Sequence, residues 1–189
     1  MGSEMCIRDR AYWTKHNADG DKVVLNAAGV EAFNKKIIAA SPTVYDMAAY
    51  PKTLSGKTVT AYVNTHTDLS DELYREGKLV SDNYKNILRS QTNAAAIPAE
   101  VTVRYGVTVR RANLRNLPTG EGLFFYASDR NFDALQETAL DPGEAVAILH
   151  TSTNGYFYYV QAYNYRGWLS KFDVAETDRS TWLRYAEPK

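Results

Sequence analysis

Apolar residues before Pro98 recur mainly at the three- and four-residue spacing of amphipathic helices. Asn26 can cap a first helix, and Pro42 ends the helical pattern soon after Ala40. The apolar face of this segment consists of Val30, Phe33 and Ile37. The pattern therefore predicts a helix that begins after Asn26 and ends near Ala40.

A short second helix is predicted over residues 71–76. Ser70 can cap it, and Gly77 can end it. Leu69 and Tyr74 flank the cap at the spacing of a hydrophobic staple, which fixes the angle at which a chain enters a helix.

A third helix is expected to begin at Ser81 or Asp82. Its shared apolar face consists of Tyr84, Ile87 and Leu88, before the pattern weakens at residues 92–93. Between the first two helices, residues 58–63 alternate apolar and polar side chains, which is typical of an isolated strand or an extended arm.

The hydrophobic period changes to two after Pro98. The alternating apolar residues are Val101, Val103, Tyr105, Val107 and Val109. Because Gly106 interrupts the alternation, the pattern predicts a strand, a bend at this glycine and a second strand.

Turn residues divide the remaining sequence into short strands. Residues 141–143 (Asp-Pro-Gly) lead into an apolar run over residues 144–150. Residues 154–155 (Asn-Gly) separate this run from residues 156–162 and form the strongest hairpin signal in the sequence. A further short strand begins at Arg166.

The predicted fold is mainly β with a helical N-terminal region, in which a small barrel packs against short helices. The predicted helical region covers residues 11–99, and the barrel covers residues 100–177. Trp168, next to Gly167, is interpreted as the large apolar side chain that the core of a small barrel needs.

The charge balance and the hydropathy of the chain limit the kinds of molecule or membrane with which it is expected to interact. Lysine and arginine number 22, as do aspartate and glutamate, and each half of the chain divided after Glu100 is also balanced. A basic surface for nucleic acid is therefore not expected. The longest uninterrupted apolar run has five residues, as at residues 145–149, so no transmembrane helix is predicted.

The first ten residues have no apolar core of a signal peptide and are interpreted as a cloning or sequence-assembly remnant. Cys6, the only cysteine, lies in this stretch. An intramolecular disulfide and a cysteine-rich metal site are therefore excluded.

The sequence contains no arrangement typical of a catalytic nucleophile. A serine or cysteine nucleophile needs a neighbouring base and usually a sharp turn, and neither a Gly-x-Ser-x-Gly elbow nor a glycine-rich phosphate loop occurs. The three histidines lie in different local contexts and make poor zinc ligands: His16, His66 and His150. The chain by itself is predicted to be non-catalytic, with no metal and no cofactor.

Aromatic residues are the feature of the sequence that favours a binding function. Seven of the thirteen residues from Tyr156 to Trp168 are aromatic, and alternate residues of a strand face opposite sides of a sheet. One interpretation is that one face fills the core while tyrosines on the other cover a partner surface. The other interpretation is that the aromatic side chains form a surface that binds a sugar or peptide.

An ordered set of short motifs resembles the bacterial SH3-like domain that precedes NlpC-type cysteine peptidases of the cell wall. The motifs are Arg111–Thr119, Asn131–Gln136, Leu140–Glu144, His150–Ser152 and Gly167–Leu169. The resemblance covers about residues 101–175. Residues 11–99 resemble the N-terminal clip region that precedes this barrel in the same enzymes.

The resemblance implies that the chain is part of a γ-D-glutamyl endopeptidase that acts on peptidoglycan stem peptides. In such enzymes the first SH3-like domain helps to shape the substrate pocket. The Asp-Cys-Ser-Gly motif of the catalytic domain does not occur in this sequence. We therefore expect a non-catalytic cell-wall targeting or substrate-positioning module in the cell envelope, periplasmic or secreted. Residues 178–189 would connect it to a missing downstream domain.

The expected ligand is a peptidoglycan stem peptide or glycan, and the expected partner is the module's own catalytic domain. Arg115 is either part of a solvated basic cluster or a contact for a stem-peptide carboxylate. Asp129 is a candidate contact for an amine, whereas Asp133 is interpreted as the cap of a turn over residues 132–136. Tyr158 and Tyr163 are candidates for stacking on the ligand. The alternative function is a protein-interaction module that docks an envelope partner.

Overall fold

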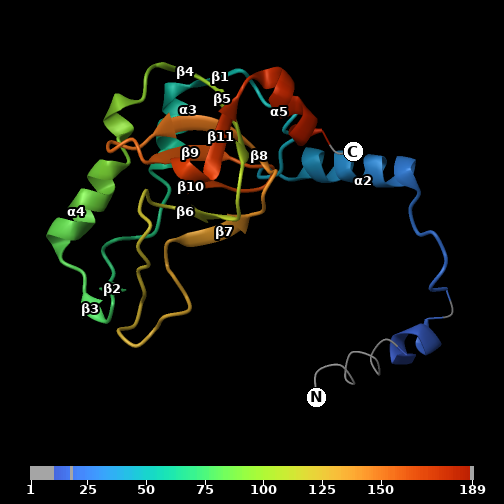
Figure 1. The fold of residues 1–189 in the computed structure, drawn as a ribbon, viewed down its shortest axis with the longest axis horizontal. Helices are drawn as coiled ribbons and strands as arrows, with labels where there is room; N and C mark the ends of the chain where they lie inside the picture. Colours follow the sequence, from blue (N-terminus) through green and yellow to red (C-terminus); the bar gives the residue numbers. More distant parts are fainter. Residues whose placement is uncertain (1–10, 18, 188–189) are drawn as a thin grey trace. The chain divides into compact units, whose positions relative to one another are not determined.

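The computed structural model of the chain describes residues 11–17 and 19–187. They belong to two compact units that divide between Ala40 and Ser41 (Figure 1). The predicted remnant at residues 1–10, with Cys6, lies outside the described residues. The domain boundaries expected after residues 99 and 177 stay predictions.

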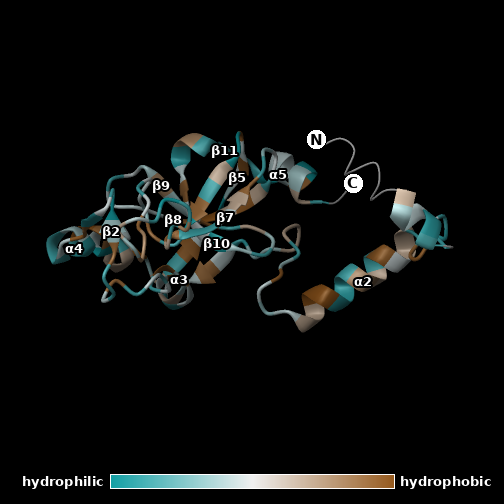
Figure 2. Ribbon diagram, turned by 90° about the horizontal axis from the view of Figure 1, so that it is seen from below, coloured by the Kyte–Doolittle hydropathy of each residue, from teal (hydrophilic) through white to brown (hydrophobic). Residues whose placement is uncertain are grey.

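The described part of the first unit is helical over residues 11–16 and over α2 (Ala27–Ala40). The backbone N–H of Gly29 donates a hydrogen bond of 2.8 Å to the side-chain oxygen of Asn26. The first predicted helix is therefore confirmed, together with its cap and its end. None of the residues of α2 is buried, so its brown apolar positions in Figure 2 are exposed.

The second unit contains an antiparallel sheet with the strand order β11-β5-β8-β9-β10-β6-β7 (Figure 1). The strands of this sheet are β5 (Arg104–Thr108), β6 (Ala112–Arg115), β7 (Gln136–Leu140), β8 (Ala145–Thr151), β9 (Phe157–Gln161), β10 (Arg166–Ser170) and β11 (Val174–Thr177). Two smaller antiparallel pairs join β1 (Thr53–Ser55) to β4 (Glu100–Thr102) and β2 (Tyr74–Arg75) to β3 (Lys78–Leu79). The helices are α3 (Gly56–Val63), α4 (Asp82–Gln91) and α5 (Arg179–Ala186), with 3-10 turns η1 (Ala94–Ala96) and η2 (Lys171–Asp173).

Both faces of the large sheet are buried at its centre. On β8, Ala145, Ala147 and Leu149 join the outer cluster, which we define by Val59, Val63, Tyr159, Trp168 and Trp182. The intervening Val146 and Ile148 join the inner cluster, defined by Leu114, Leu140, Val160, Leu169 and Val174. A strand buried on both faces has no polar alternation, which explains the uninterrupted apolar run at residues 145–149.

The inner cluster shows that the sheet curls. It contains Val174 from the edge strand β11 and Leu140 from the opposite edge strand β7. The predicted closed barrel is nevertheless not found, because no pairing between β11 and β7 joins the edges within residues 11–17 and 19–187. The fold is therefore a mixed α/β arrangement of a seven-stranded antiparallel sheet with N-terminal helices.

The outer cluster places α3 and α5 against the sheet. Val59 and Val63 of α3 and Trp182 of α5 are fully buried in it. The indole N–H of Trp182 donates to the carbonyl of Val146 at 3.1 Å. Trp168 is also fully buried, which confirms its predicted place in the core.

The prediction of a strand or extended arm at residues 58–63 is wrong, because these residues belong to helix α3. The hydroxyl of Ser55 accepts a hydrogen bond of 3.1 Å from the N–H of Thr58 and caps the helix. Val59 and Val63 are four residues apart, so they share a helix face as well as fitting a period of two. Burial of that face against the sheet decides in favour of the helix.

The predicted helix at residues 71–76 is also wrong, because this segment enters the β2–β3 hairpin. Its two turn residues, Glu76 and Gly77, have φ values of 52° and 80°, as a tight two-residue hairpin turn requires. Tyr74 exchanges two backbone hydrogen bonds with Phe124, at 2.7 and 2.9 Å. Pairing with a segment 50 residues away therefore overrides the local helix signal.

Helix α4 is confirmed with Ser81 as its cap. Its buried face differs from the prediction, because Ile87 is 46% exposed and Lys85 is buried. The ammonium of Lys85 donates to the carbonyl of Asp71 at 2.7 Å, which satisfies the buried charge with a backbone acceptor.

The hairpin predicted at residues 154–155 is confirmed by the antiparallel pairing of β8 with β9. The bend predicted at Gly106 is wrong, because this glycine lies inside β5 and the break between strands falls at Val103. A Cβ atom at Gly106 would approach Val174 to 2.5 Å, so the glycine allows β5 and β11 to pack closely. In the described part of the chain, no helix has the length and apolarity needed to cross a bilayer.

Candidate functional site

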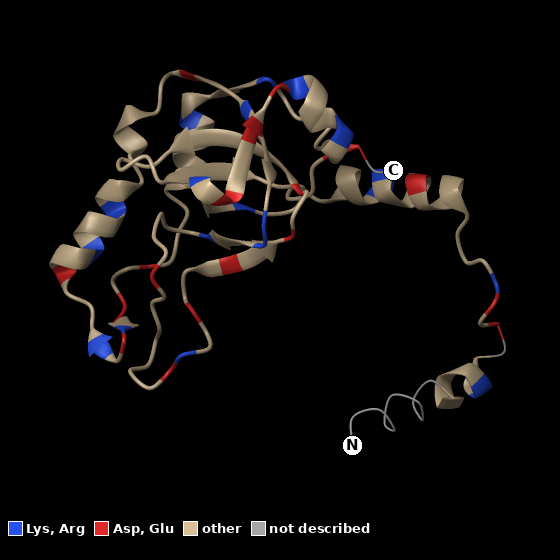
Figure 3. Ribbon diagram, viewed as in Figure 1, with Lys and Arg blue, Asp and Glu red and all other residues tan. Residues whose placement is uncertain are grey.

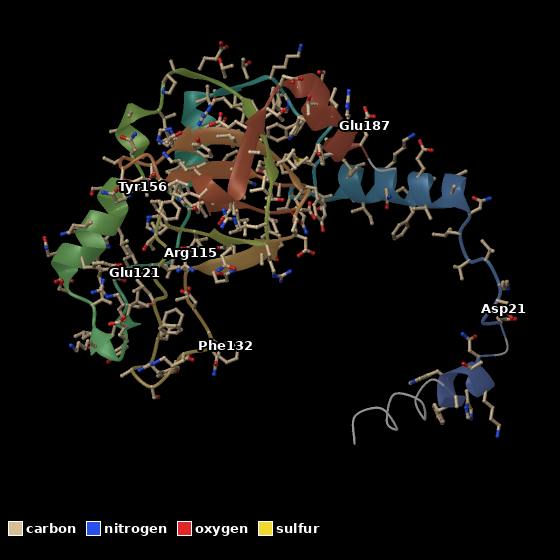
Figure 4. All side chains as sticks on the ribbon, in the orientation of Figure 1. Asp21, Arg115, Glu121, Phe132, Tyr156 and Glu187 are labelled. Atoms are coloured by element: carbon tan, nitrogen blue, oxygen red, sulfur yellow. The ribbon has the colours of Figure 1, made fainter. Side chains whose placement is uncertain are left out.

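The β6–β7 segment (residues 116–135) is held by Arg115 at its base. The guanidinium Nη1 of Arg115 lies 2.7 Å from a carboxylate oxygen of Asp133, and Nη2 donates to the carbonyl of Glu121. Arg115 is only 5% exposed. Figure 4 shows Arg115 and Glu121 near the base of this segment, with Phe132 at its outer part.

Asp133 caps the turn as the sequence predicted. Its Oδ1 accepts hydrogen bonds from the N–H groups of Leu135 at 3.0 Å and Leu123 at 3.1 Å. The same carboxylate therefore pairs with Arg115 and closes the segment. Nη1 and Nη2 of Arg115 are engaged by Asp133 and Glu121, whereas its Nε is buried without a hydrogen-bond partner among the described residues.

Asp129 lies on the exposed outer part of the β6–β7 segment. Its Oδ1 accepts hydrogen bonds from the N–H groups of Asn131 at 2.8 Å and Phe132 at 3.3 Å. The bond from Asn131 is the main cause of a lowered pKa of the Asp129 carboxyl. Asp129 is therefore an ionised, exposed group, as an amine contact requires, and that role stays a prediction.

The two candidate tyrosines lie in different environments. The hydroxyl of Tyr158 donates to Glu176 at 2.6 Å, and the guanidinium carbon of Arg104 lies 4.8 Å from its ring centroid. Burial raises the pKa of Tyr158, and the bond to Glu176 adds to the shift. Tyr163 is 49% exposed in the turn between β9 and β10. The structure gives no direct contact between any two of the four predicted site residues.

A cavity of about 750 Å³ lies where α3, the ends of the β6–β7 segment and the β9–β10 turn meet. Its walls are formed by Thr43, Val44, Tyr62, Thr65, Asn116, Glu137, Tyr159, Gln161, Asn164, Tyr165, Arg166 and Gly167. We call it the β9–β10 pocket. It contains none of the four predicted site residues, although Tyr163 is the chain neighbour of Asn164.

Three polar atoms in the walls of the β9–β10 pocket are buried and have no hydrogen-bond partner among the described residues. They are Oδ1 of Asn116, Oε1 of Gln161 and Nη1 of Arg166. Gln161 is 1% exposed and Asn116 is 9% exposed. Buried polar groups in folded proteins are almost always paired, so these three unpaired atoms make the pocket a candidate binding site for a ligand or ordered water.

Arg166 is held by aromatic stacking. Its guanidinium carbon lies 3.8 Å from the centroid of the Tyr62 ring. The hydroxyl of Tyr159 donates to the backbone carbonyl of Tyr62 at 2.8 Å, which ties the same helix end to β9. Among the described residues, the guanidinium is oriented by this cation–π contact, and no carboxylate forms an ion pair with it.

The pKa of Tyr159 responds to the charged groups that line the pocket. Burial raises the pKa of its hydroxyl far above the ordinary range; the charge of Arg166 opposes this rise, and that of Glu137 adds to it. Both charged groups thus act on one buried phenol. Charges of both signs are spread over the second unit in Figure 3, so the pocket is set apart by its unpaired polar atoms and not by an excess of one charge.

The residues of the β9–β10 pocket were missed by the sequence analysis. Gln161 carries a weak signal, since it is the one polar residue of the apolar stretch from Phe157 to Ala162. Asn116 and Glu137 are 21 residues apart and meet only because β6 pairs with β7. Their amide–carboxylate contact, at 3.0 Å, follows from tertiary structure and leaves no local motif.

Comparison with known proteins identifies one domain. Residues 123–170 match the family model of the SH3 domain (SH3b1 type). This match confirms the SH3-like domain expected from the motifs. A comparison with curated proteins found no match.

A solved structure similar to this chain is that of a novel NlpC/P60 endopeptidase from Photobacterium damselae subsp. piscicida. The two are 17% identical in sequence, with a TM-score of 0.49. The match covers 68% of this chain and 38% of the endopeptidase chain, so this chain spans well under half of that protein.

Proposed function

We propose that this chain is a non-catalytic module of a peptidoglycan peptidase of the NlpC type, which binds the cell wall and positions a stem peptide for cleavage. The observation that carries the proposal is the β9–β10 pocket, whose buried polar atoms lack partners among the described residues. Seven of its twelve lining residues lie within the SH3b1-type match at residues 123–170. Such a pocket suits a ligand with several hydrogen-bonding groups, as peptides have.

The predicted site residues take distinct parts in this proposal. Arg115 is a positioning residue, because its pair with Asp133 holds the segment that begins at Asn116. Tyr163 stacks on ligand at the rim, next to Asn164. Asp129 and Tyr158 are further contacts outside the β9–β10 pocket, reached by a longer ligand or through the catalytic domain as partner.

The proposed place of action is the cell envelope, periplasmic or secreted. The chain itself supplies no nucleophile in this proposal, and a separate catalytic domain provides the thiolate that attacks the stem peptide. The purified chain should therefore release no product from γ-D-glutamyl-diaminopimelate peptides. Hydrolysis that persists in Cys6→Ser would contradict the non-catalytic part of the proposal.

The binding proposal is tested by sedimentation of the chain with purified peptidoglycan sacculi. We expect retention of the parent chain, and reduced retention of Arg166→Gln, which removes the stacked cation of the pocket. The matched control is Arg110→Gln, since Arg110 is exposed and pairs with Asp173. Equal retention of the two variants, or none of the parent, would reject the proposal.

The alternative is a protein-interaction module that docks an envelope partner. A pair of exposed aromatic rings favours it: Tyr156 is 53% exposed and Phe172 is 61% exposed, with centroids 6.0 Å apart. The ammonium of Lys171 lies 5.3 and 5.5 Å from the two rings. Loss of co-purifying envelope protein from Tyr156→Ser or Tyr163→Ser, with unchanged binding to sacculi, would support this function.

A further inference from the structure

The β9–β10 pocket contains one cation and one anion that do not pair with each other. Arg166 and Glu137 both line it and both act on the hydroxyl of Tyr159. None of the ion pairs among the described residues joins Arg166 to Glu137. Opposite charges that share a pocket without pairing can each receive a complementary charge from a ligand.

The two buried amides add acceptors to the pocket. The nitrogen of Gln161 donates to the carbonyls of Ala162 at 2.8 Å and Tyr165 at 3.0 Å. The nitrogen of Asn116 donates to the hydroxyl of Thr67 at 2.7 Å and to Glu137 at 3.0 Å. Because the nitrogens are engaged, both amides are fixed in orientation, and their oxygens are the atoms left for a ligand.

We propose that the β9–β10 pocket recognises an α-amino acid head group, that is, an ammonium and a carboxylate on one carbon. The carboxylate pairs with Nη1 of Arg166, whose guanidinium carbon lies over the ring of Tyr62. The ammonium donates to the oxygens of Gln161 and Asn116 and is neutralised by Glu137.

Other ligand classes fit these groups less well. A phosphate would face the carboxylate of Glu137 and two amide oxygens with a single guanidinium in its favour. An apolar ligand would leave three buried polar atoms unpaired, each at a desolvation cost. A zwitterion with N–H donors can pair with the guanidinium, the carboxylate and both amide oxygens.

This inference deepens the proposed function and rests on it for the source of the head group. In a stem peptide, the free end of a diamino acid carries an ammonium and a carboxylate on one carbon. A free amino acid presents the same chemistry. The cavity of about 750 Å³ is larger than one amino acid head group, so it has room for a chain attached to it.

The probe is meso-diaminopimelate, titrated into the full ¹⁵N-labelled chain up to about 10 mM, the range of weak binding. We expect amide shifts at residues 161–167 and 116. Glu137→Gln and Arg166→Gln should each weaken binding at least about tenfold, as loss of a charged hydrogen bond does. Glu187→Gln and Arg110→Gln are the controls, matched in charge and absent from the pocket lining, and should bind like the parent.

Derivatives of the probe test the two charges separately. Acetylation of both amines should abolish the shifts in the parent, and so should esterification of both carboxylates. No shifts in the parent, or equal shifts with a blocked probe or in both pocket variants, would overturn the inference.

The sacculus experiment separates this inference from the proposed function. Retention on sacculi without any response to diaminopimelate rejects the head-group assignment and leaves the cell-wall function in place. A response to diaminopimelate without retention on sacculi supports the head-group assignment with a free amino acid as its source, and rejects the cell-wall function.

Discussion

The guanidinium of Arg115 and the carboxylate of Asp133 form an ion pair of 2.7 Å in which the side chains are 6% and 18% exposed. The pair joins the end of β6 to the last turn of the β6–β7 segment. Asp133 also accepts the N–H groups of Leu123 and Leu135, so one carboxylate closes both sides of this segment. This charge pair therefore joins both ends of a long surface segment.

Removing the cation of this pair should destabilise the fold. Arg115→Met leaves the carboxylate of Asp133, which is only 18% exposed, without its partner, and breaking a buried pair costs about 3 to 5 kcal/mol of unfolding free energy. Urea denaturation of the two chains measures the difference. Arg111→Met is the control, because its pair with Asp141 is 68% exposed on both sides and is worth under about 1 kcal/mol. Similar losses in the two variants would show that burial does not decide the effect.

Gly77→Ala should destabilise the β2–β3 hairpin. Gly77 has a φ of 80°, where an alanine costs roughly 1 to 2 kcal/mol through contact of its Cβ with the backbone. The added Cβ would also lie 3.2 Å from the carbonyl oxygen of Ala127. Thermal unfolding of Gly77→Ala against Gly120→Ala checks this, since a Cβ at Gly120 meets nothing within 4 Å. A larger loss in Gly120→Ala would refute the assignment of strain.

His150 should make stability depend on pH. Burial lowers the pKa of His150, whose ring nitrogen lies 3.0 Å from the carbonyl oxygen of Asn93. The unfolded chain therefore binds the proton more readily. The contribution is fully present above the ordinary pKa of about 6.5 and is lost as pH falls from there toward the lower folded-state pKa.

The measurement is the urea midpoint of the parent chain and of His150→Gln between about pH 7.5 and pH 5.5. The parent should lose more stability on acidification than the variant. Burial raises the pKa of Glu144, which acts in the opposite direction in both chains and cancels in the comparison. An equal pH slope in the two chains would exclude His150 as the cause.

Two truncations should differ in their effect on stability. A chain that starts at Ser41 should unfold at the same temperature as the parent, because no described residue from 11 to 40 is buried. A chain that starts at Glu100 lacks buried members of the outer cluster and should lose solubility and cooperative unfolding. The members lost are Met47, Tyr50, Val59 and Val63. Unchanged melting of the shorter chain would mean that the sheet is stable without these helices.

Local sequence signals were sufficient to predict an element where the residues of one short segment determine its structure. Asn26 and Ser81 cap their helices through their own side chains, and the turn at residues 154–155 follows from the backbone freedom of Asn-Gly. The resemblance to the SH3-like domain could likewise be recognised from the sequence, because its motifs lie in order along the chain.

The amino-acid sequence was enough to predict the capped helices α2 and α4, the Asn-Gly turn at residues 154–155, the two-residue period after Pro98 and the SH3-like domain, since each rests on neighbours in the chain. The tertiary structure alone decided that residues 58–63 form a helix and that residues 74–79 form a hairpin, because burial and pairing with distant segments outweigh local preference. It also decided the β9–β10 pocket. Asn116, Glu137, Gln161 and Arg166 meet there through strand pairing and packing, which no local spacing encodes.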